Sequence, residues 1–411
     1  MSWKEVKLGE LYTAYNGLSK SKKFFGTGDP FLTFSTVFNN YFLPRKLTEY
    51  VQSTIQEQQN YSICRGDVFI TRTSEKSDEL GLSCVALKDY PKATYNGFTK
   101  RLRPINPDCV VPEYIGYYMR MPAFRQEFQA FSTMTTRASL RNDDLLGLTV
   151  LLPNIKTQER IAGILRHYDF LIENNQKQIK LLEEAAQRLY KEWFIDLRFP
   201  GYKNVEIVDG IPEGWNIRSF NEVFSYVRGK SYKSSELSES EGALLVNLKN
   251  INAFGGYKRN AEKRYLGTYK ADQSLDAGDI VMGVTDMTQE RRLVGHVAIV
   301  PDLGENMTFS MDLIKLIPKS VTRGYLYSAM RFGGYSEQIS QFANGVNVLH
   351  LKPESIMNMI MVVPSKDVLE RYENIFELYR KKVELLEKQS NYLTEARDRL
   401  LPKLMSVEIE V

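Results

Sequence analysis

The chain has 411 residues, which at roughly 100–200 residues per domain predicts two to four domains rather than one compact core. Hydrophobic residues make up 43% and charged residues 25% of the sequence, close to globular averages, and this excludes a wholly disordered or fibrous chain. The net charge of +4, from 54 basic and 50 acidic residues, is too small to indicate a nucleic-acid partner by itself.

The sequence contains neither a membrane-span pattern nor a secretion signal. No apolar stretch approaches the roughly 20 residues that a membrane helix needs. The opening residues, MSWKEVKLGELY, lack the apolar core of a signal peptide. We therefore expect a cytoplasmic protein with no membrane partner. Cys64, Cys84 and Cys109 have no CxxC spacing, which favours reduced thiols over metal or redox chemistry.

The first predicted element is an α+β globule over residues 1–153. It opens with Trp3-Lys-Glu-Val-Lys-Leu-Gly-Glu-Leu11, continues through Arg65-Gly-Asp-Val-Phe-Ile-Thr71 and closes with Leu148-Thr-Val-Leu-Leu-Pro153. Short β-branched and aromatic runs, separated by Gly, Asn, Asp and Pro, are typical of strands and turns. Asp67 follows a glycine in the second motif, and we interpret it as a turn former rather than a catalytic acid.

A long helix is predicted over residues 154–197. Apolar residues recur every seven positions along two adjoining edges, which is the pattern of a coiled-coil seam. The polar Asn175 within this seam can fix the register of a helix pair. The seam residues are Ile161, Leu165, Tyr168, Ile172, Asn175, Ile179, Leu182 and Leu189. Residues 198–214 are rich in Gly, Pro and Asn and are interpreted as a linker.

The second globule, residues 215–364, repeats the first. Trp3 returns as Trp215 and Asp67 returns as Asp279 at the same interval. Pro153 returns as Pro364 at an interval that is almost the same. A nearly constant offset over the whole length indicates an internal duplication, so both globules are expected to share one fold.

The second helix, residues 365–405, repeats the seam less strictly, because Ser390 and Arg397 interrupt it. Two such helices are expected to pair as an antiparallel coiled coil relating two tandem, pseudo-symmetric α+β copies. At 1.5 Å per residue, about 33 residues give a spacer of roughly 50 Å. Packing of each helix back on its own globule remains the alternative. The second seam contains Tyr379, Val383, Leu386, Leu393 and Leu400.

Four features together resemble the specificity subunits of type I restriction–modification enzymes. They are the Trp-x-x-x-x-Leu-Gly-Glu opening, the Gly-Asp strand, the helix start Gln158-Glu159-Arg160-Ile161 and the Gly210-Ile-Pro-Glu-Gly-Trp215 entry into the second copy. The resemblance covers nearly the whole chain in the order of that family. The second helix start departs from the pattern, because Val368-Leu-Glu370 stands where the first copy has Thr157-Gln158-Glu159.

The resemblance implies a non-catalytic subunit that reads double-stranded DNA. Each globule would be a target-recognition domain for one half of a split, asymmetric sequence, and the helices would set the unread gap. The helices would also dock DNA methyltransferase subunits, two in number, and through them the restriction (translocase) subunits. The resemblance implies no metal or cofactor in this chain; S-adenosylmethionine, ATP and Mg²⁺ would belong to the partner subunits.

Candidate DNA contacts fall in three pairs of segments at corresponding places in the two copies. One pair is a Gly-flanked basic loop near the start of each globule, one follows the Gly-Asp strand, and one precedes the last strand. Cations suit phosphates, whereas amides, hydroxyls and arginine suit base edges, although the same composition also describes ordinary solvated loops. The candidates are Lys20, Lys22, Lys23, Arg72, Thr73, Thr136, Arg137, Lys230, Tyr232, Lys233, Thr285, Arg291, Arg292, Asn344 and Asn347.

Two other functions compete with this interpretation. A DNA methyltransferase is disfavoured because Asp29-Pro-Phe31 lacks the second proline of a base-holding motif and Gly26-Thr-Gly28 does not lead into a predicted helix. His167, His296 and His350 have no metal-ligand spacing. A coiled-coil protein-interaction scaffold without DNA specificity stays open. Steeply salt-dependent DNA binding distinguishes a DNA reader from that scaffold.

Overall fold

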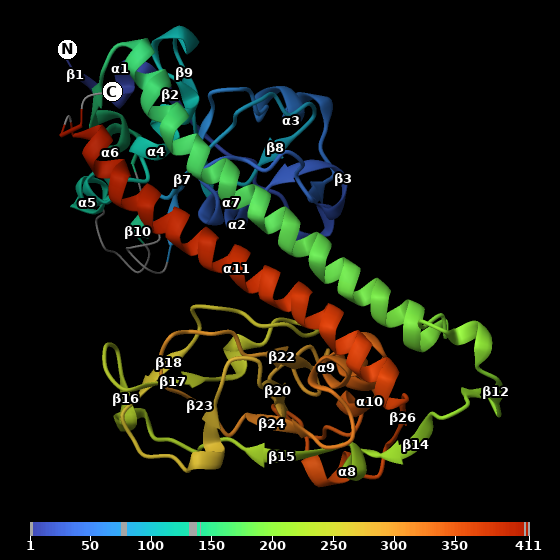
Figure 1. Ribbon diagram of the computed structural model, residues 1–411. Helices are drawn as coiled ribbons and strands as arrows, with labels where there is room; N and C mark the ends of the chain where they lie inside the picture. The colour runs from blue at the N-terminus through green and yellow to red at the C-terminus, as the bar shows by residue number, and fades with distance from the viewer. Residues whose placement is uncertain (1–2, 75–79, 131–137, 140, 407, 410–411) are drawn as a thin grey trace. The chain divides into compact units, whose positions relative to one another are not determined.

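The computed structural model describes residues 3–74, 80–130, 138–139, 141–406 and 408–409. The chain divides into two compact units, shown in Figure 1. Unit 1 comprises Met1–Glu173 and Ser390–Val411, and unit 2 comprises Asn174–Gln389. Two long helices, α7 (Ile155–Tyr190) and α11 (Lys366–Met405), each contribute one part to each unit. Within the described residues, no helix has the length and apolar character needed to cross a membrane.

Unit 1 is built on an antiparallel sheet in the order β2-β9-β5-β7. A smaller sheet has the order β4-β3-β8, and two strand pairs, β1–β11 and β6–β10, complete the unit. The strands are β1 (Lys4–Lys7), β2 (Tyr12–Asn16), β3 (Phe25–Leu32), β4 (Glu49–Val51), β5 (Val68–Thr71), β6 (Thr73–Ser74), β7 (Ser83–Val85), β8 (Thr94–Tyr95), β9 (Thr99–Pro104), β10 (Ala138–Ser139) and β11 (Thr149–Leu152). The short helices are α1 (Leu8–Leu11), α2 (Phe34–Asn39), α3 (Ile55–Asn60), α4 (Pro112–Tyr118), α5 (Pro122–Ala130) and α6 (Asn142–Gly147).

Unit 2 has the corresponding antiparallel sheet, β15-β24-β20-β22, and the corresponding pairs β14–β26 and β21–β25. Its second sheet is larger than that of unit 1, with the order β16-β18-β17-β23-β19. The strands are β14 (Asn216–Ser219), β15 (Phe224–Arg228), β16 (Leu237–Ser238), β17 (Ala243–Val246), β18 (Lys263–Tyr265), β19 (Ser274–Leu275), β20 (Ile280–Gly283), β21 (Thr285–Asp286), β22 (Val297–Ile299), β23 (Met307–Phe309), β24 (Leu313–Pro318), β25 (Leu349–His350) and β26 (Ile360–Val363). The helices are α8 (Phe220–Val223), α9 (Arg323–Phe332) and α10 (Tyr335–Ser340).

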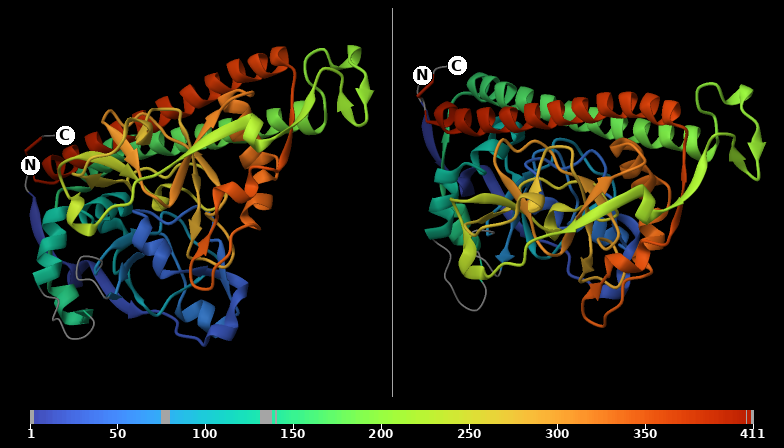
Figure 2. Two further views of the ribbon diagram at one scale, coloured as in Figure 1. Left: turned by 90° about the horizontal axis from the view of Figure 1, so that it is seen from below. Right: turned by 60° about the horizontal axis from the view of Figure 1, so that its bottom comes forward.

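A hairpin of β12 (Ile207–Val208) and β13 (Ile211–Pro212) lies between α7 and β14. Figure 2 shows it projecting away from the sheets of unit 2. Its turn contains Asp209 and Gly210, both with positive φ, and an Asp-Gly turn of this kind is a strong hairpin signal.

The main sheets of the two units match strand for strand, β2 and β5 at the interval found in the sequence and β9 and β7 at an interval two residues longer. β2 begins at Tyr12 and β15 at Phe224, which are separated by the same interval as Asp67 and Asp279. The two Gly-Asp turns also match, because Asp67 accepts a hydrogen bond from the Cys64 amide at 2.8 Å and Asp279 accepts one from the Asp276 amide at 3.0 Å. Both aspartates are therefore turn formers, as predicted.

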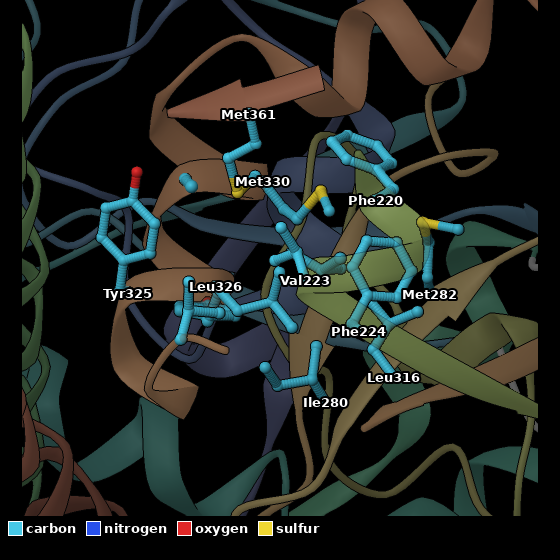
Figure 3. Packing of buried hydrophobic residues seen from close by; sticks show 14 of the residues in the cluster. Phe220, Val223, Phe224, Ile280, Met282, Leu316, Tyr325, Leu326, Met330 and Met361 are labelled. Atoms are coloured by element: carbon cyan, nitrogen blue, oxygen red, sulfur yellow. The ribbon is translucent and has the colours of Figure 1, made fainter. Parts of the chain in front are cut away.

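The core of unit 2 lies between its main sheet and helices α8 and α9. Phe220 and Phe224, from α8 and β15, pack with Ile280 and Leu316 from the sheet and Leu326 from α9, as Figure 3 shows. All five side chains are buried. The two phenylalanine rings lie 5.2 Å apart between centroids. Burial of a large apolar side chain contributes about 1.5–3 kcal/mol, so this core anchors the sheet that carries the loops of unit 2.

The helices α7 and α11 are in contact within each unit. In unit 1, Leu165 shares a core with Leu404, and Asp169 accepts a hydrogen bond from Arg397 at 2.6 Å. In unit 2, the Asn175 amide donates to the Leu386 carbonyl at 3.5 Å. Rising numbers on α7 meet falling numbers on α11, which is an antiparallel arrangement. Because Asn175 and Leu386 are separated by the repeat interval of the two helices, they occupy equivalent positions of the two copies.

The seam residues contact the other long helix and also the globule of their own copy. α11 also packs on the globule of its own copy, since the Tyr372 hydroxyl donates to Ser328 of α9 at 2.8 Å. All predicted seam residues are buried or half-buried, namely Ile161, Leu165, Tyr168, Ile172, Asn175, Ile179, Leu182, Leu189, Tyr379, Val383, Leu386, Leu393 and Leu400.

The interruption of the second seam at Arg397 has a structural use. Its guanidinium bonds Asp169, which also accepts from the Tyr117 hydroxyl. The side chains of Arg397 and Asp169 are each only 12% exposed. Arg397 also lies over the Tyr41 ring, at 5.0 Å from its centroid. A buried charge that loses its partner is strongly destabilising, because the remaining charge is neither paired nor solvated.

We therefore predict that Arg397→Met lowers the free energy of unfolding by about 3–5 kcal/mol. Arg399→Met is the matched control. Arg399 is exposed, and its ion pair with Glu395 is a surface pair at 4.0 Å. Such a pair contributes about 0–1 kcal/mol. Chemical denaturation of the full chain measures both values. Equal destabilisation by the two substitutions would contradict the proposed role of the Arg397–Asp169 pair.

Candidate nucleic-acid interface

A tight turn between β8 and β9 organises one edge of unit 1. The Thr99 amide donates to the Asn96 carbonyl at 3.0 Å, and the Phe98 amide donates to the Asn96 side-chain oxygen at 2.7 Å. We call residues 96–99, and the equivalent residues 310–313 of unit 2, the hub turns. In unit 2 the Leu313 amide donates to the Ser310 carbonyl at 3.0 Å.

The basic loop of unit 1 is fastened to its hub turn by two backbone hydrogen bonds. The Leu18 amide donates to the Tyr95 carbonyl at 2.8 Å, and the Gly97 amide donates to the Leu18 carbonyl at 2.8 Å. The segment after β5 is fastened to the same turn, because the Arg72 amide donates to the Phe98 carbonyl at 2.9 Å. β6, which follows Arg72, pairs with β10 and so brings in the segment before the last strand.

Unit 2 repeats these hydrogen bonds at equivalent positions. The Lys230 amide donates to the Phe309 carbonyl at 2.7 Å, and the Met311 amide donates to the Lys230 carbonyl at 2.9 Å. The Val284 amide donates to the Asp312 carbonyl at 2.8 Å. The pair β21–β25 takes the place of β6–β10. In each unit, therefore, the basic loop and the segment after the Gly-Asp strand are hydrogen-bonded to one hub turn, and a strand pair follows the second of these segments.

A glycine allows the basic loop to approach each hub turn. A Cβ atom on Gly17 would lie 2.1 Å from the Asn96 carbonyl oxygen, and one on Gly229 would lie 2.0 Å from the Ser310 carbonyl oxygen. Gly17 and Gly229 are equivalent positions of the duplication, so in both copies a glycine avoids a clash with a carbonyl oxygen of the hub turn. Such close backbone approach is a position where only glycine fits.

The exposed cations of the unit 1 site are Lys22 and Lys23. Lys20 is placed differently, because its ammonium group bonds Glu57 and the Gln52 carbonyl, both at 2.6 Å. It therefore holds the loop in place within the unit, and its contact with phosphate stays a prediction.

Arg72 lies beside a second cation at the unit 1 hub turn. It is half-buried, and the Lys100 ammonium bonds Asn142 nearby. Burial, and next the neighbouring Arg72 guanidinium, lower the pKa of Lys100. Two cations held this close favour an anion beside them. Thr136 and Arg137 lie outside the described residues, and for Thr73 only the strand pairing of its backbone is described.

In unit 2, the side chains of two candidates form hydrogen bonds inside the unit. Thr285 is buried and its hydroxyl donates to Asp312 of the hub turn at 3.0 Å. Arg291 donates to the Ser340 carbonyl at 2.8 Å. The structure engages both side chains inside the unit, and their contacts with DNA stay predictions.

The remaining unit 2 candidates lie at or near the surface. Lys230 and Tyr232 are half-buried, and the Tyr232 hydroxyl accepts a hydrogen bond from Lys263 at 2.8 Å. The exposed candidates are Lys233, Arg292, Asn344 and Asn347.

Sequence reasoning missed Asp286, which shapes the loop that carries Arg292. Its carboxylate accepts hydrogen bonds from the backbone amides of Thr288 at 2.7 Å, Leu293 at 2.6 Å and Val294 at 3.2 Å. Burial by itself would raise the pKa of Asp286, but these hydrogen bonds lower it. The Asp-x-Thr spacing, typical of a side chain that caps its own turn, was the available signal.

We predict that Gly17→Ala separates the basic loop from the hub turn and lowers stability by about 2 kcal/mol or more, as overpacking does. Gly163→Ala is the control, because Gly163 lies on α7 with open space around it, and this change should stabilise by about 0.4–1 kcal/mol. Denaturant unfolding of both variants measures the difference. A Gly17→Ala protein as stable as the wild type would contradict the steric argument.

Known proteins resemble this chain in sequence and in fold. Residues 1–184 match the family described as type I restriction modification DNA specificity domain. The S subunit of a type I restriction–modification system from M. genitalium shares the fold, with a TM-score of 0.58 at 15% identity over 98% of this chain and 96% of that chain. These matches confirm the predicted resemblance to type I specificity subunits.

Two curated relatives extend along the whole chain. The type I restriction enzyme MjaIX specificity subunit of Methanocaldococcus jannaschii is 24% identical over 436 residues, covering 99% of this chain and 93% of that protein. The type I restriction enzyme HindI specificity subunit of Haemophilus influenzae is 22% identical over 485 residues, covering 99% of both. Both relatives are named as specificity subunits, which agrees with the predicted resemblance.

Proposed function

We propose that this chain is the non-catalytic DNA-recognition subunit of a type I restriction–modification complex. Each unit reads one half of a split sequence in double-stranded DNA. The observation that carries the proposal is the repeated hub turn, to which the basic loop and the segment after the Gly-Asp strand are hydrogen-bonded in both copies. Because the side chains on the two hub turns differ, the two half-sites differ and the whole target is asymmetric.

The exposed residues around the hub turns suit this task. Lys22, Lys23 and Arg292 supply cations for phosphates, and Asn344 and Asn347 supply amides that can bond both polar atoms of an adenine edge. Arg72 can serve as a phosphate contact or as a base contact, since the hub turn fixes its backbone and its side chain is half-buried. Lys20, Thr285 and Arg291 act indirectly, by holding the loops in position.

The long helices act as the spacer between the two reading units. α7 has 36 residues, or about 54 Å at 1.5 Å per residue. The proposal is supported by contacts between the two helices inside each unit, at Asn175–Leu386 and at Asp169–Arg397. Two linked readers bind more tightly than either alone when their spacing fits the duplex, and sites on one face of DNA lie about 34–36 Å apart per helical turn.

The exposed apolar residues of α11 form a docking stripe for a methyltransferase subunit. Leu378, Leu385 and Tyr392 are exposed and recur every seven residues. On α7, Phe170 and Leu181 are also exposed. A heptad-spaced apolar stripe without a partner fits the seam of a helix from another subunit. Restriction subunits join the complex through the methyltransferase subunits.

We predict that Leu378→Glu combined with Leu385→Glu weakens methyltransferase binding at least tenfold, because each buried leucine contributes about 1.5–3 kcal/mol. Lys381→Glu combined with Lys382→Glu is the control, since both lysines are exposed on the same helix. Titration calorimetry with the purified methyltransferase subunit measures the affinities. If the leucine variant binds as tightly as the wild type, the stripe is not the docking surface.

The function itself is tested by mapping methylated bases in a host genome with and without this chain, in the presence of its methyltransferase subunits. The proposal predicts methylation within one split, asymmetric sequence only when the chain is present. DNA affinity of the complex should also fall steeply with salt as phosphate contacts release counterions. Salt-insensitive assembly without any sequence-dependent methylation would favour the protein-interaction scaffold instead.

A further inference from the structure

Each hub turn presents one large apolar side chain to solvent. Phe98 is 59% exposed, and Met311, on the equivalent turn of unit 2, is 56% exposed. Both lie among the polar segments that converge on the turn. Isolated exposed apolar residues are common on protein surfaces, so exposure alone does not assign a role to either residue.

The backbone around both residues is fixed. The Phe98 amide donates to the Asn96 side chain at 2.7 Å, and its carbonyl accepts from the Arg72 amide at 2.9 Å. The Met311 amide donates to the Lys230 carbonyl at 2.9 Å. These hydrogen bonds fix the backbone of each turn at the residue that carries the exposed apolar side chain.

The charges next to Phe98 indicate what it faces. Arg72 is bonded to Phe98 through the backbone, and Lys100 is close enough to Arg72 for its pKa to be lowered by that charge. The loop carrying Lys22 and Lys23 is bonded to the preceding residue of the turn, Gly97. Cations carried by segments that are bonded to the same turn as an exposed aromatic ring would engage phosphates and bring the ring to the bases near them.

We propose that Phe98 and Met311 are apolar wedges that insert against the base stack, one in each half-site. This inference rests on the proposed function and adds a mode of recognition to it. Phe and Met are among the side chains that partly unstack a base step when they enter a groove. Such insertion selects steps that deform easily, which are pyrimidine–purine steps, at positions where no hydrogen bond reads the bases.

The chain offers a matched control for each wedge. Ile105 is 58% exposed and follows β9, whereas Phe98 precedes the same strand. Ile317 is 40% exposed near the far end of β24, which follows Met311. Each control residue is therefore apolar and exposed, but lies at the opposite end of the strand from the hub turn.

The test uses the full chain assembled with its methyltransferase subunits, on duplexes that carry 2-aminopurine at successive positions of each half-site. The methylated base is left out, because methyltransferases extrude their target base. We expect binding to raise the fluorescence at one step in each half-site. Phe98→Ala should abolish the rise in one half-site and weaken binding about 5- to 100-fold, and Met311→Ala should do the same in the other half-site.

The controls Ile105→Ala and Ile317→Ala should leave both fluorescence signals and the affinity unchanged. Thermal unfolding of all four variants should match the wild type, because every substituted side chain is exposed. Sequence-specific binding by the wild type with no fluorescence rise, or with a rise that survives Phe98→Ala, would overturn the wedge while leaving the proposed function intact. Absence of any sequence-specific binding by the wild-type complex would instead overturn the proposed function and the wedge with it.

Discussion

The backbone hydrogen bonds of the two hub turns are the constraint on which the candidate site depends. In unit 1 they join residues 18, 72 and 95–98, and in unit 2 they join residues 230, 284 and 309–312. All of these bonds are made by amides and carbonyls, so they do not depend on side-chain identity. Gly97 can therefore correspond to Met311, and Phe98 to Asp312, while the loops stay in the same arrangement.

The backbone hydrogen bonds of the hub turns, which we call the frame, are kept while the side chains on them differ. The two copies can therefore present different surfaces on the same frame. The frame is kept by a few residues whose role is steric or structural, such as Gly17 and Gly229, which admit a carbonyl at close range. Residues on the outer side of the frame are free to differ. A recognition protein of this design changes its target by surface substitutions that cost little stability.

Much of the fold could be predicted from the sequence because its signals are local or periodic. The heptads around Ile161 and Leu386 define helices, and the recurring interval between Asp67 and Asp279 defines the duplication. The candidate segments could be proposed from their composition. The attachment of two of them to one hub turn could not be predicted, because it depends on hydrogen bonds between residues far apart in the chain, such as Leu18 and Tyr95.

The intramolecular partners of single side chains could not be predicted for the same reason. Lys20 and Arg291 have the composition of DNA contacts, but their partners, Glu57 and the Ser340 carbonyl, are distant in sequence and engage them within the protein. Arg397 interrupts the apolar heptad pattern in the sequence, yet in the structure it pairs with Asp169, which is far away in the chain. Side-chain partners across such distances leave no signal in one sequence.

The central claim is that each copy reads its own half of the target from its own hub turn. The most direct measurement replaces residues 215–364 with a second copy of residues 1–153 and maps the methylated sequence in a genome that supplies the methyltransferase subunits. The account predicts that the asymmetric target becomes an inverted repeat of one half-site. An unchanged asymmetric target would contradict it.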